Sequence, residues 1–413
     1  MAGGKTVIVG GSMAGLFAAN MLHRAGWQVS VLERSASPLS GRGAGIVTHT
    51  GMLRLLEKAG VATSDGLGVA LKQRLSFDRQ GHIRADIKFS QILMSWSRLH
   101  ALLRCALPAK CYVLDRWVQQ VSFGNSSSAA EVVCSDGQRY QADLLIAADG
   151  VRSTLRAALL PDEHAQVAPY VAWRGLALQS ALSCPAQRRL GESFVVVSEP
   201  GEEMISYPVL GDDGQVYVNF VWYRRVTAAQ RQALFTDATG VFHPDGISPR
   251  LIRSEHLARA RRDAKACFHA ELAELVERSD ELLLQVIVDQ RASVMHRGRM
   301  ALIGDAAFVA RPHVGQGVTK AGGDAWALCQ CVGDGSLDIP AALSRYSSLR
   351  VPVGRLAVQR ARELGAVLLP ASARSAAMRR WAQYYADPRA LLADTAVELP
   401  GLAHLDVGFG GLA

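Results

Sequence analysis

The sequence predicts an α/β fold in which a Rossmann-like nucleotide-binding domain is joined to a second domain built on an antiparallel sheet. Three strand ends predict it: a β-branched strand before a glycine turn near the N-terminus, an apolar strand ending at Asp149-Gly150, and another ending at Gly304-Asp305. Alternating strands and short turns fill much of the range 167–287. A chain of 413 residues, nearly half of them hydrophobic, suits two domains that share a core.

The N-terminal segment has the pattern of a βαβ nucleotide-binding unit. A strand over 6–9 leads into a glycine turn, a helix is expected over 16–25, and a strand over 29–32 ends at Glu33. This acid stands about 20 residues after the turn, as binding of a ribose hydroxyl requires. Ser12 replaces the middle glycine of the usual pattern, and its hydroxyl could donate to a phosphate oxygen. The pattern predicts a pyrophosphate cradle, with a bare structural turn as the alternative; its residues are Gly10, Ser12, Met13, Ala14 and Gly15.

Two later strands also end at acids. A strand over 142–148 ends at Asp149, which can cap the turn that follows. The other ends at Gly304-Asp305, where the acid suits a ribose or ribityl hydroxyl, and a helix is expected from about 318 to 331. Glycine N–H groups and the positive end of that helix make the intervening loop an anion site. Any strand-to-helix junction can end in Asp-Gly, so the prediction depends on the order of all three motifs.

The rest of the chain supplies the other elements. Helices are expected over 51–59, 97–103, 227–235, 251–276 and 373–385. Strands are expected over 73–78 and 83–89, in a hairpin of 111–123 with 130–134, and over 194–197, 203–208 and 215–223. The predicted domains are a discontinuous nucleotide-binding domain of 1–72, 95–166 and 288–365, a substrate domain of 73–94 and 167–287, and a C-terminal helix and tail of 366–413.

Composition and charge exclude several classes of protein. The net charge is +8, from 45 basic and 37 acidic residues, but no basic stripe alternates with stacking aromatics, so nucleic acid is not an expected partner. A solvated basic face that attracts an anionic cofactor or substrate is the preferred interpretation. The 7 scattered cysteines form no Cys-x-x-Cys pair and predict reduced thiols in a cytoplasmic chain without a metal site. The first strand leaves no room for a signal peptide, and no apolar run reaches the ~18 residues of a membrane span.

The order and spacing of the three motifs resemble those of the single-component FAD-dependent aromatic hydroxylases, the family typified by para-hydroxybenzoate hydroxylase. Shorter strings at 38–47, 170–175, 219–223 and 311–313, together with Ser12, are similar to the 2,6-dihydroxypyridine 3-hydroxylase branch. The resemblance implies a monooxygenase that uses FAD, NADH or NADPH, and O2 to hydroxylate an electron-rich aromatic or N-heteroaromatic ring through a flavin C4a-hydroperoxide. Only one dinucleotide turn is evident, so the nicotinamide cofactor is expected to bind transiently. A homodimer is left open.

The resemblance also assigns positions along the cofactor. Glu33 should hold the adenosine ribose and Arg34 should lie beside the adenine, with a solvated surface charge as an equal alternative for Arg34. Arg42 and Arg98 should approach the flavin phosphate or ribityl chain, with a structural ion pair as the alternative for either. Further cofactor contacts are expected from Ala44, Gly45, Asp149, Asp305, Pro312, Gly315, Gln316, Gly317 and Val318, the last four presenting N–H groups to the pyrimidine edge of the flavin.

Substrate contacts are expected on the antiparallel strands and beside the flavin loop, from Arg174, Tyr207, Trp222 and His313. His313 could orient a substrate hydroxyl or act as a general base, and with Tyr207 and Pro312 it makes up the predicted catalytic set. Trp222 and Tyr223 point to opposite faces of one strand, so at most one of them can face a pocket. A packing role is the alternative for each residue. For the chain as a whole, the alternatives are an epoxidase or reductase of the same fold, or a scaffold without flavin.

Overall fold

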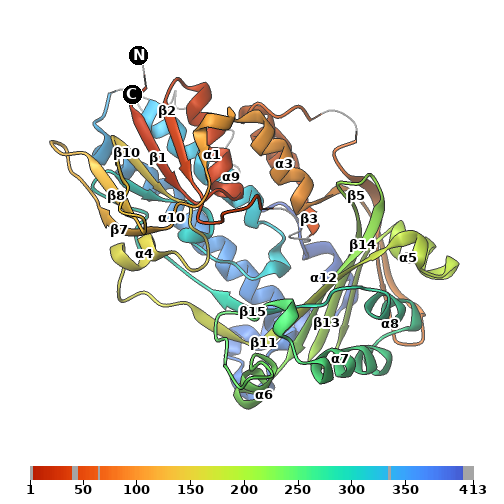
Figure 1. Ribbon diagram of the computed structural model, residues 1–413. Helices are drawn as coiled ribbons and strands as arrows, with labels where there is room; N and C mark the ends of the chain where they lie inside the picture. The colour runs from red at the N-terminus through yellow and green to blue at the C-terminus, as the bar shows by residue number, and fades with distance from the viewer. Residues whose placement is uncertain (1–2, 40–44, 64–65, 334–335, 403–413) are drawn as a thin grey trace.

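The computed structural model describes residues 3–39, 45–63, 66–333 and 336–402, and within them two large sheets lie next to each other (Figure 1). A six-stranded sheet carries the N-terminal strand, and an eight-stranded sheet forms the second layer of the molecule. A small three-stranded sheet is attached to the first; its strands are β7 (Val118–Ser122), β8 (Ala130–Cys134) and β9 (Arg139–Ala142). The predicted α/β fold with a Rossmann-like domain and an antiparallel sheet is confirmed.

The six-stranded sheet brings the predicted motifs to one edge. Its order is β16-β17-β10-β1-β2-β6, parallel except for β16, and its strands are β1 (Lys5–Val9), β2 (Gln28–Leu32), β6 (Tyr112–Val113), β10 (Leu144–Ala147), β16 (His296–Arg297) and β17 (Met300–Leu302). Val9 pairs with Leu32 on one side and with Ala147 on the other. The glycine turn, Glu33 and Asp149 therefore follow strand ends that lie side by side.

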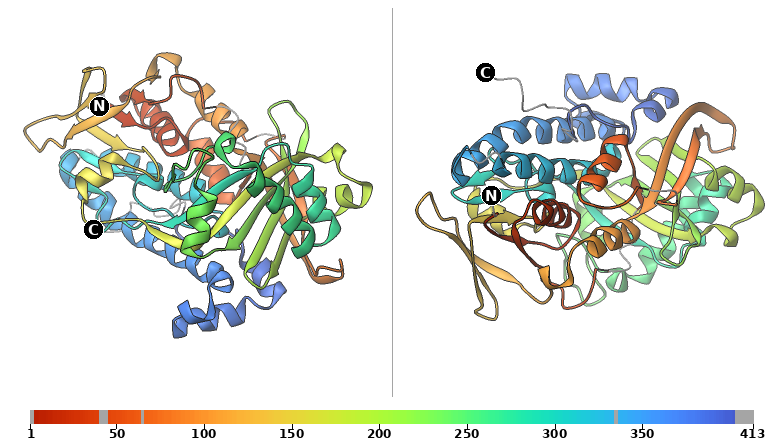
Figure 2. Two further views of the ribbon diagram at one scale, coloured as in Figure 1. Left: turned by 60° about the horizontal axis from the view of Figure 1, so that its bottom comes forward. Right: turned by 90° about the horizontal axis from the view of Figure 1, so that it is seen from above.

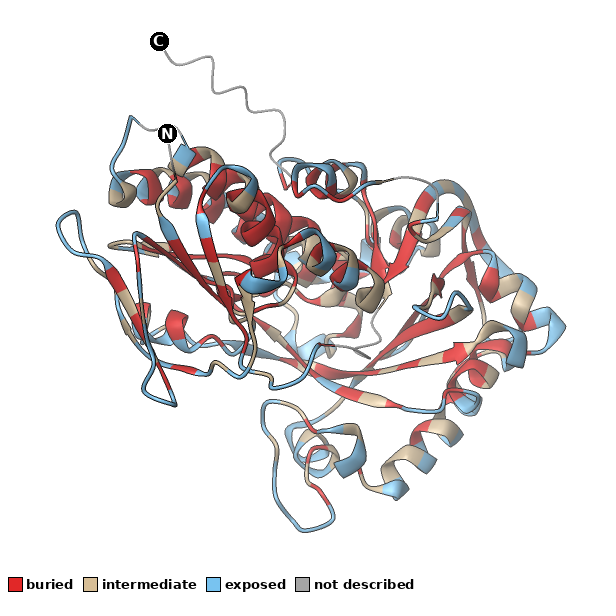
Figure 3. Cartoon of the chain, turned by 45° about the horizontal axis from the view of Figure 1, so that its top comes forward, coloured by how far each residue is buried: buried red, intermediate tan, exposed pale blue. Residues whose placement is uncertain are grey.

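The apolar strands of the six-stranded sheet contact β8 and β9 of the small sheet and a group of helices. The group consists of α1 (Met13–Arg24), α2 (Thr50–Lys58), α3 (Trp96–Ala106), α4 (Thr154–Leu159), α9 (Gly317–Gly333) and α10 (Ile339–Leu364). Helix α1 packs against α9 and α3, and α9 also contacts α2 and α10. Residues 13–22 of α1 are all buried, as expected for a helix that is apolar on nearly every side. In Figure 3 buried residues fill the strands and the inner helices, while loops and outer helix faces are exposed.

The eight-stranded sheet has the order β15-β11-β14-β13-β12-β4-β5-β3, and only the β12–β4 pair is parallel. Its strands are β3 (Gly45–Val47), β4 (Val69–Phe77), β5 (Ile83–Ser95), β11 (Gln166–Leu178), β12 (Phe194–Glu199), β13 (Glu202–Leu210), β14 (Val216–Arg225) and β15 (Leu283–Asp289). Gly45–Val47 pairs with β5, which adds this loop segment to the larger sheet. Gly45–Val47 therefore belongs to the second sheet, although it follows β2 of the first sheet in the chain.

The two faces of the larger sheet have different partners, because successive side chains of a strand point to opposite sides. One face packs on α5 (Cys184–Gly191), α7 (Ser254–Cys267) and α8 (Ala270–Glu277), seen in front of the sheet in the left view of Figure 2. The other face turns towards the six-stranded domain and the C-terminal helices α11 (Ala376–Tyr384) and α12 (Pro388–Asp394). The short α6 (Ala228–Leu234) follows β14, and its Leu234 lines a small cavity together with Ala260 of α7.

Some predicted boundaries are wrong, for local reasons. The strand expected over 111–123 is broken where Asp115 adopts a φ of 56°, so β6 joins the main sheet and β7 joins the small one. The helix expected over 251–276 is two helices, α7 and α8, separated at Phe268 and His269. Helix α10, which contains Pro352, has no counterpart among the predicted elements.

All seven cysteines are free thiols in the structure. Across the described ranges, no group of His, Cys, Asp and Glu side chains is arranged to hold a metal ion. Among the helices that the structure describes, none is both long enough and apolar enough to cross a membrane.

Candidate functional site

Two cavities meet at the edge where the strands of the six-stranded sheet end. The turn cavity has a volume of 340 Å³ and lies over the glycine turn, Glu33 and Asp149. The sheet cavity has a volume of 240 Å³ and lies between the eight-stranded sheet and the loop 309–318. Asp305 and Val151 line both cavities. One long ligand could therefore extend from the glycine turn to the larger sheet without leaving the protein.

The glycine turn is packed too closely for larger residues. Gly10 has a φ of 108°, and a Cβ there would lie 2.3 Å from the carbonyl oxygen of Ala148. A Cβ at Gly15 would lie 1.9 Å from the carbonyl oxygen of Gly10. Ser12 begins α1 without using its hydroxyl as a cap, and it lines the turn cavity. The first turn of α1, which holds the buried Met13 and Ala14, thus presents its free N–H groups and positive dipole end to this cavity, as a phosphate requires.

Glu33 shapes the turn as well as lining the cavity. Its Oε2 accepts from the Gly11 N–H at 2.9 Å, and its Oε1 accepts from the Ser35 N–H at 2.9 Å. Arg34 is exposed and also lines the turn cavity. The carboxylate is therefore fixed at the end of β2, where the predicted ribose contact requires an acid.

Asp149 is engaged by the start of α4. It accepts from the Ser153 hydroxyl at 2.5 Å, and from the N–H groups of Thr154 at 2.9 Å and Leu155 at 3.3 Å. Burial raises the pKa of this carboxyl, and these hydrogen bonds oppose the rise. Asp149 therefore stabilises the α4 N-terminus at the wall of the turn cavity, which is the capping function that the sequence predicts.

Arg98 does not join the site in this structure. Its guanidinium donates to the carbonyl oxygens of Leu67 at 3.2 Å and Gly66 at 2.7 Å, and it lines neither cavity. It therefore ties α3 to the segment before β4. Two further predicted cofactor contacts, Arg42 and Ala44, lie outside the described residues.

Asp305 is held by a buried network around Gly304. Lys320 Nζ donates to the Gly304 carbonyl at 2.7 Å, Asp324 accepts from the Gly304 N–H at 2.9 Å, and Arg350 donates to Asp324 at 2.7 Å. Burial raises the pKa of the Asp305 carboxyl, and the charge of Lys320 opposes that rise. Within the described chain the Asp305 carboxylate makes no hydrogen bond of its own, so it is available to a hydroxyl that passes between the two cavities.

The loop after Asp305 presents backbone to the sheet cavity. Pro312, Gly315, Gln316, Gly317 and Val318 all line it, and the φ of 62° at Gly315 turns the chain into α9. The Gln316 Oε1 is buried and has no partner in the part of the chain that the structure describes. Free N–H groups at the start of α9 and an unsatisfied amide oxygen fit the polar edge of a flavin ring.

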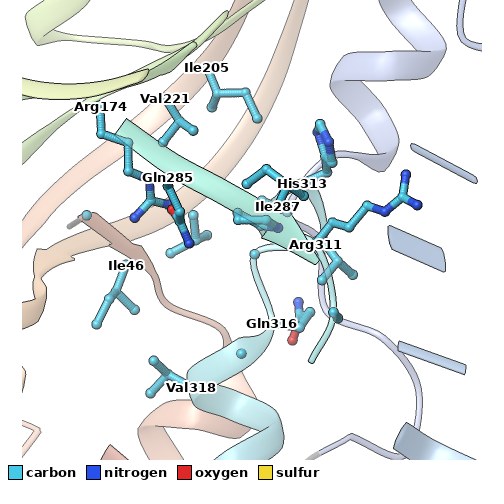
Figure 4. A pocket seen from close by; sticks show the side chains of 18 of the residues that line it. Ile46, Arg174, Ile205, Val221, Gln285, Ile287, Arg311, His313, Gln316 and Val318 are labelled. Atoms are coloured by element: carbon cyan, nitrogen blue, oxygen red, sulfur yellow. The ribbon is translucent and has the colours of Figure 1, made fainter. Parts of the chain in front are cut away.

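The wall of the sheet cavity is rich in hydrogen-bond donors. Arg174 of β11 and Gln285 of β15 reach towards the same space, opposite the loop that carries His313 and Gln316 (Figure 4). Arg174 Nε and the Tyr223 hydroxyl are buried without a partner in the described residues. Tyr207 stacks on Phe194, and burial raises its pKa to about 12, so its hydroxyl stays protonated. Unsatisfied donors of this kind call for a ligand with oxygen acceptors.

Trp222 is not part of this wall, contrary to the prediction. It is completely buried on the opposite face of the sheet, against Phe268, and its Nε1–H donates to Glu202 at 2.7 Å. Tyr223 lines the cavity instead. The sequence shows that these two side chains point to opposite faces, but only the pairing of β14 with β13 decides which face holds the cavity.

His313 lies in the cavity wall with both ring nitrogens engaged. Nδ1 is 2.8 Å from Glu203 Oε1 and Nε2 is 3.0 Å from the Tyr170 hydroxyl, which accepts from Arg311 at 2.9 Å. The neutral ring satisfies all groups when Nδ1–H donates to Glu203 and the Tyr170 O–H donates to Nε2. Arg311 is held in turn by Asp289 at 2.8 Å. These side chains therefore form one buried series of hydrogen bonds and ion pairs beside the cavity.

Glu203 is the residue that sequence reasoning missed. Its side chain is 1% exposed, and its Oε2 has no partner among the described residues. The sequence did contain a signal for this residue. Glu203 lies on the same face of its strand as the apolar Ile205 and Tyr207, and an acid on an apolar face indicates a buried partner. Its contact with a histidine 110 residues away was not visible in the sequence.

Comparisons with known proteins agree with this geometry. Residues 4–361 match the family described as FAD binding domain. The chain is 30% identical over 336 residues to the 2,6-dihydroxypyridine 3-monooxygenase of Paenarthrobacter nicotinovorans, covering 79% of this chain and 82% of that protein. It is 29% identical over 363 residues to the aurachin C monooxygenase/isomerase of Stigmatella aurantiaca, covering 84% and 85%. The solved structure of 2,6-dihydroxypyridine-3-hydroxylase from Arthrobacter nicotinovorans gives a TM-score of 0.83 at 26% identity, covering 88% and 92%.

The family match runs from the first strand to the end of α10 and so includes all three predicted motifs. The match to the FAD binding domain family and the monooxygenase relatives confirm the expected cofactor FAD and the co-substrate O2. The expected reduced nicotinamide donor is the electron source that such a reaction implies. The chain belongs to the single-component FAD-dependent aromatic hydroxylases, the monooxygenase family typified by para-hydroxybenzoate hydroxylase.

Proposed function

We propose that this enzyme hydroxylates a hydroxypyridine-like ring in the sheet cavity, with FAD extended from the turn cavity to the loop 312–318. The observation that carries the proposal is the position of Asp305, which lines both cavities and whose carboxylate makes no hydrogen bond to the described residues. The adenosine and pyrophosphate would be held by Glu33 and the glycine turn, the ribityl chain by Asp305, and the flavin ring by the backbone of Gly315 to Val318. The relative that acts on 2,6-dihydroxypyridine supports the choice of ring.

The bound flavin, reduced by NAD(P)H, would supply the activation of O2 that transfers one oxygen atom to the ring and leaves the other as water. The route through a C4a-hydroperoxide stays a prediction. The protein has to orient the ring, exclude water and stabilise charge on the ring oxygen. Arg174 and Tyr223 suit the last task, because each offers a buried donor without an acceptor among the described residues. The protonated hydroxyl of Tyr207 lines the same cavity.

His313 is proposed to accept at Nε2 the proton that a ring hydroxyl releases when it ionises, once the Tyr170 hydroxyl, which donates to Nε2 in the structure, turns away. Ionisation makes the ring electron-rich and therefore more reactive towards the transferred oxygen atom. Glu203 holds Nδ1–H and would stabilise the imidazolium that forms, as a buried carboxylate does in other histidine dyads. Pro312, which precedes His313 in the cavity wall, would limit the space beside the reacting edge of the flavin.

Anaerobic stopped-flow spectroscopy tests this proposal. The FAD-loaded protein is reduced by NADH or NADPH, with and without 2,6-dihydroxypyridine, other hydroxypyridines and phenols, and is then mixed with O2. We expect ring-stimulated reduction, a transient near-ultraviolet band before reoxidation, and a hydroxylated product with one oxygen atom from O2. Reoxidation without product across the panel would contradict the proposal and favour an epoxidase or reductase.

A further inference from the structure

We propose that Ala396 determines substrate specificity in the sheet cavity, and that the buried Arg74 is the positioning residue that holds it there. This inference rests on the proposed function, because it takes the sheet cavity as the ring site. Ala396 belongs to a C-terminal strap, defined as residues 395–402, which follows α12. The strap lies outside the residues 4–361 that match the FAD binding domain family. Ala396 is nevertheless one of the residues that line the cavity.

Ala396 is fitted against the flavin loop. It is 4% exposed and has a φ of 51°, a left-handed backbone conformation that residues other than glycine rarely adopt. Its N–H donates to the His313 carbonyl at 3.3 Å. A Cβ added to Gly315 would lie 2.6 Å from the Ala396 Cβ. The methyl group of Ala396 therefore occupies the space that Gly315 leaves open and sets the depth of the cavity at this point.

Arg74 holds the strap through its carbonyl groups. It is fully buried in β4 and donates to the carbonyl oxygens of Leu392 at 2.8 Å, Thr395 at 2.5 Å and Ala396 at 3.3 Å. Leu392 and Thr395 lie at the C-terminal end of α12, where carbonyl groups lack helical partners and a cation is favourable. Arg74 therefore caps α12 and fixes the start of the strap.

The guanidinium of Arg74 has no acidic partner in the described ranges of the chain. Its other contacts are the Gln91 side-chain oxygen and the rings of Phe89 and Phe194, 3.8 Å and 4.7 Å from the ring centres. Burial lowers its pKa to about 9. A buried cation compensated only by neutral groups depends on all of them being in place. Replacing Arg74 by a neutral residue should therefore free the strap from β4 without breaking a salt bridge.

The rest of the strap is fastened to three helices of the FAD-binding domain. Gln316 donates to the Val397 carbonyl, Glu398 Oε1 accepts from the Gly51 N–H at 2.9 Å, and Arg350 donates to the Leu402 carbonyl at 2.9 Å. These contacts join the N-termini of α2 and α9 to α10. The strap is thus part of the cavity wall, and its position is linked to the loop that would hold the flavin ring.

Substitution of Ala396 tests the specificity role. Ala396→Gly removes the methyl group and suits the left-handed backbone. The ratio kcat/KM is measured in the parent enzyme and the variant, for the substrate 2,6-dihydroxypyridine and for its singly methylated derivatives. We expect about a tenfold gain for at least one methylated ring relative to the parent ring, the usual scale for one methyl group in a fitted pocket. Ratios that stay within about twofold for every derivative would overturn the role of Ala396.

Substitution of Arg74 tests the positioning role. In Arg74→Met we expect amide hydrogen exchange over residues 388–402 to accelerate at least tenfold, together with a raised KM, while exchange in β1 and α1 stays unchanged. Arg74→Lys should restore part of the protection. Arg225→Met is the matched control, because Arg225 donates to the carbonyls of Leu368 and Leu369 outside the strap. Equal protection of 388–402 in Arg74→Met and Arg225→Met would overturn the role of Arg74.

The two proposals fail in different ways. If the parent protein binds these rings, as shown by the flavin absorbance change, but forms no hydroxylated product, the proposed function fails while the dissociation constants still decide the role of Ala396. Hydrogen exchange does not require turnover, so it decides the role of Arg74 in either case. If Arg74→Met does not fold, Arg74→Lys provides the exchange comparison.

Discussion

The buried pair of Glu203 and His313 gives a sharp prediction about catalysis. Glu203→Gln keeps the shape of the side chain and an oxygen that can accept from Nδ1–H, but it removes the negative charge 2.8 Å from the ring. Glu203→Leu removes the acceptor as well. The two variants therefore separate the need for a charge from the need for a hydrogen bond.

The structure sets the expected magnitudes. With neutral His313, Glu203→Gln exchanges a charged hydrogen bond for a neutral one, a loss of about 1 kcal/mol, and it also avoids the cost of burying a carboxylate. The free energy of unfolding should therefore change by no more than about 1 kcal/mol. Glu203→Leu leaves a buried N–H unsatisfied and should cost about 1 to 3 kcal/mol. Once His313 is protonated, its imidazolium and the Glu203 carboxylate, about 4 Å apart, attract each other by about 4 kcal/mol at an effective dielectric constant of about 20. Glu203→Gln removes this stabilisation of the protonated state and should therefore slow hydroxylation about 1,000-fold.

Single-turnover hydroxylation of the ring that the parent enzyme accepts, with FAD content matched between proteins, measures this loss. The control is Glu202→Gln, because Glu202 faces the other side of β13, where it pairs with Arg224 at 3.1 Å and Trp222. Glu202→Gln should hydroxylate at the parent rate. If Glu203→Gln hydroxylates within about twofold of the parent, the carboxylate does not stabilise a transferred proton and the role given to His313 is wrong.

Three further predictions follow from single contacts. Gly315→Ala should lower the free energy of unfolding, measured in urea, by about 2 to 5 kcal/mol, because the new side chain strains a left-handed backbone and overlaps Ala396. Adding Ala396→Gly should restore only the part of this free energy that the overlap costs. Strictly additive losses in the double variant would contradict this. Burial raises the pKa of Tyr207 to about 12, so the folded protein binds this proton more tightly than the unfolded chain does. The parent should therefore lose about 2 kcal/mol of stability relative to Tyr207→Phe as the pH rises from 10 to 12, and parallel stability curves would refute this. Asp305→Ala should weaken FAD binding about 30-fold in a fluorescence titration, the value of one charged hydrogen bond, and an unchanged dissociation constant would remove Asp305 from the cofactor site.

The sequence by itself determined the family and the α/β fold, and it predicted the cofactor end of the site. Local patterns suffice for these, because a buried strand, a glycine turn and an acid at the strand end lie within a few residues of one another. Parallel pairing of β1 with β2 and β10 then brings Gly10, Glu33 and Asp149 to one edge. Residues such as Asp305 can be placed in this way because each one directly follows a recognisable strand.

Only the tertiary structure decided which side chains line the sheet cavity. Tyr223 rather than Trp222 faces it, since a strand of alternating large residues carries no local mark of which face packs on α7 and α8. Glu203 meets His313, and Arg74 meets the strap, across 110 and more than 300 residues. Arg98 donates to the backbone carbonyls of Gly66 and Leu67 and lines neither cavity. These contacts depend on strand register and on the packing of distant segments, which no short window of sequence contains.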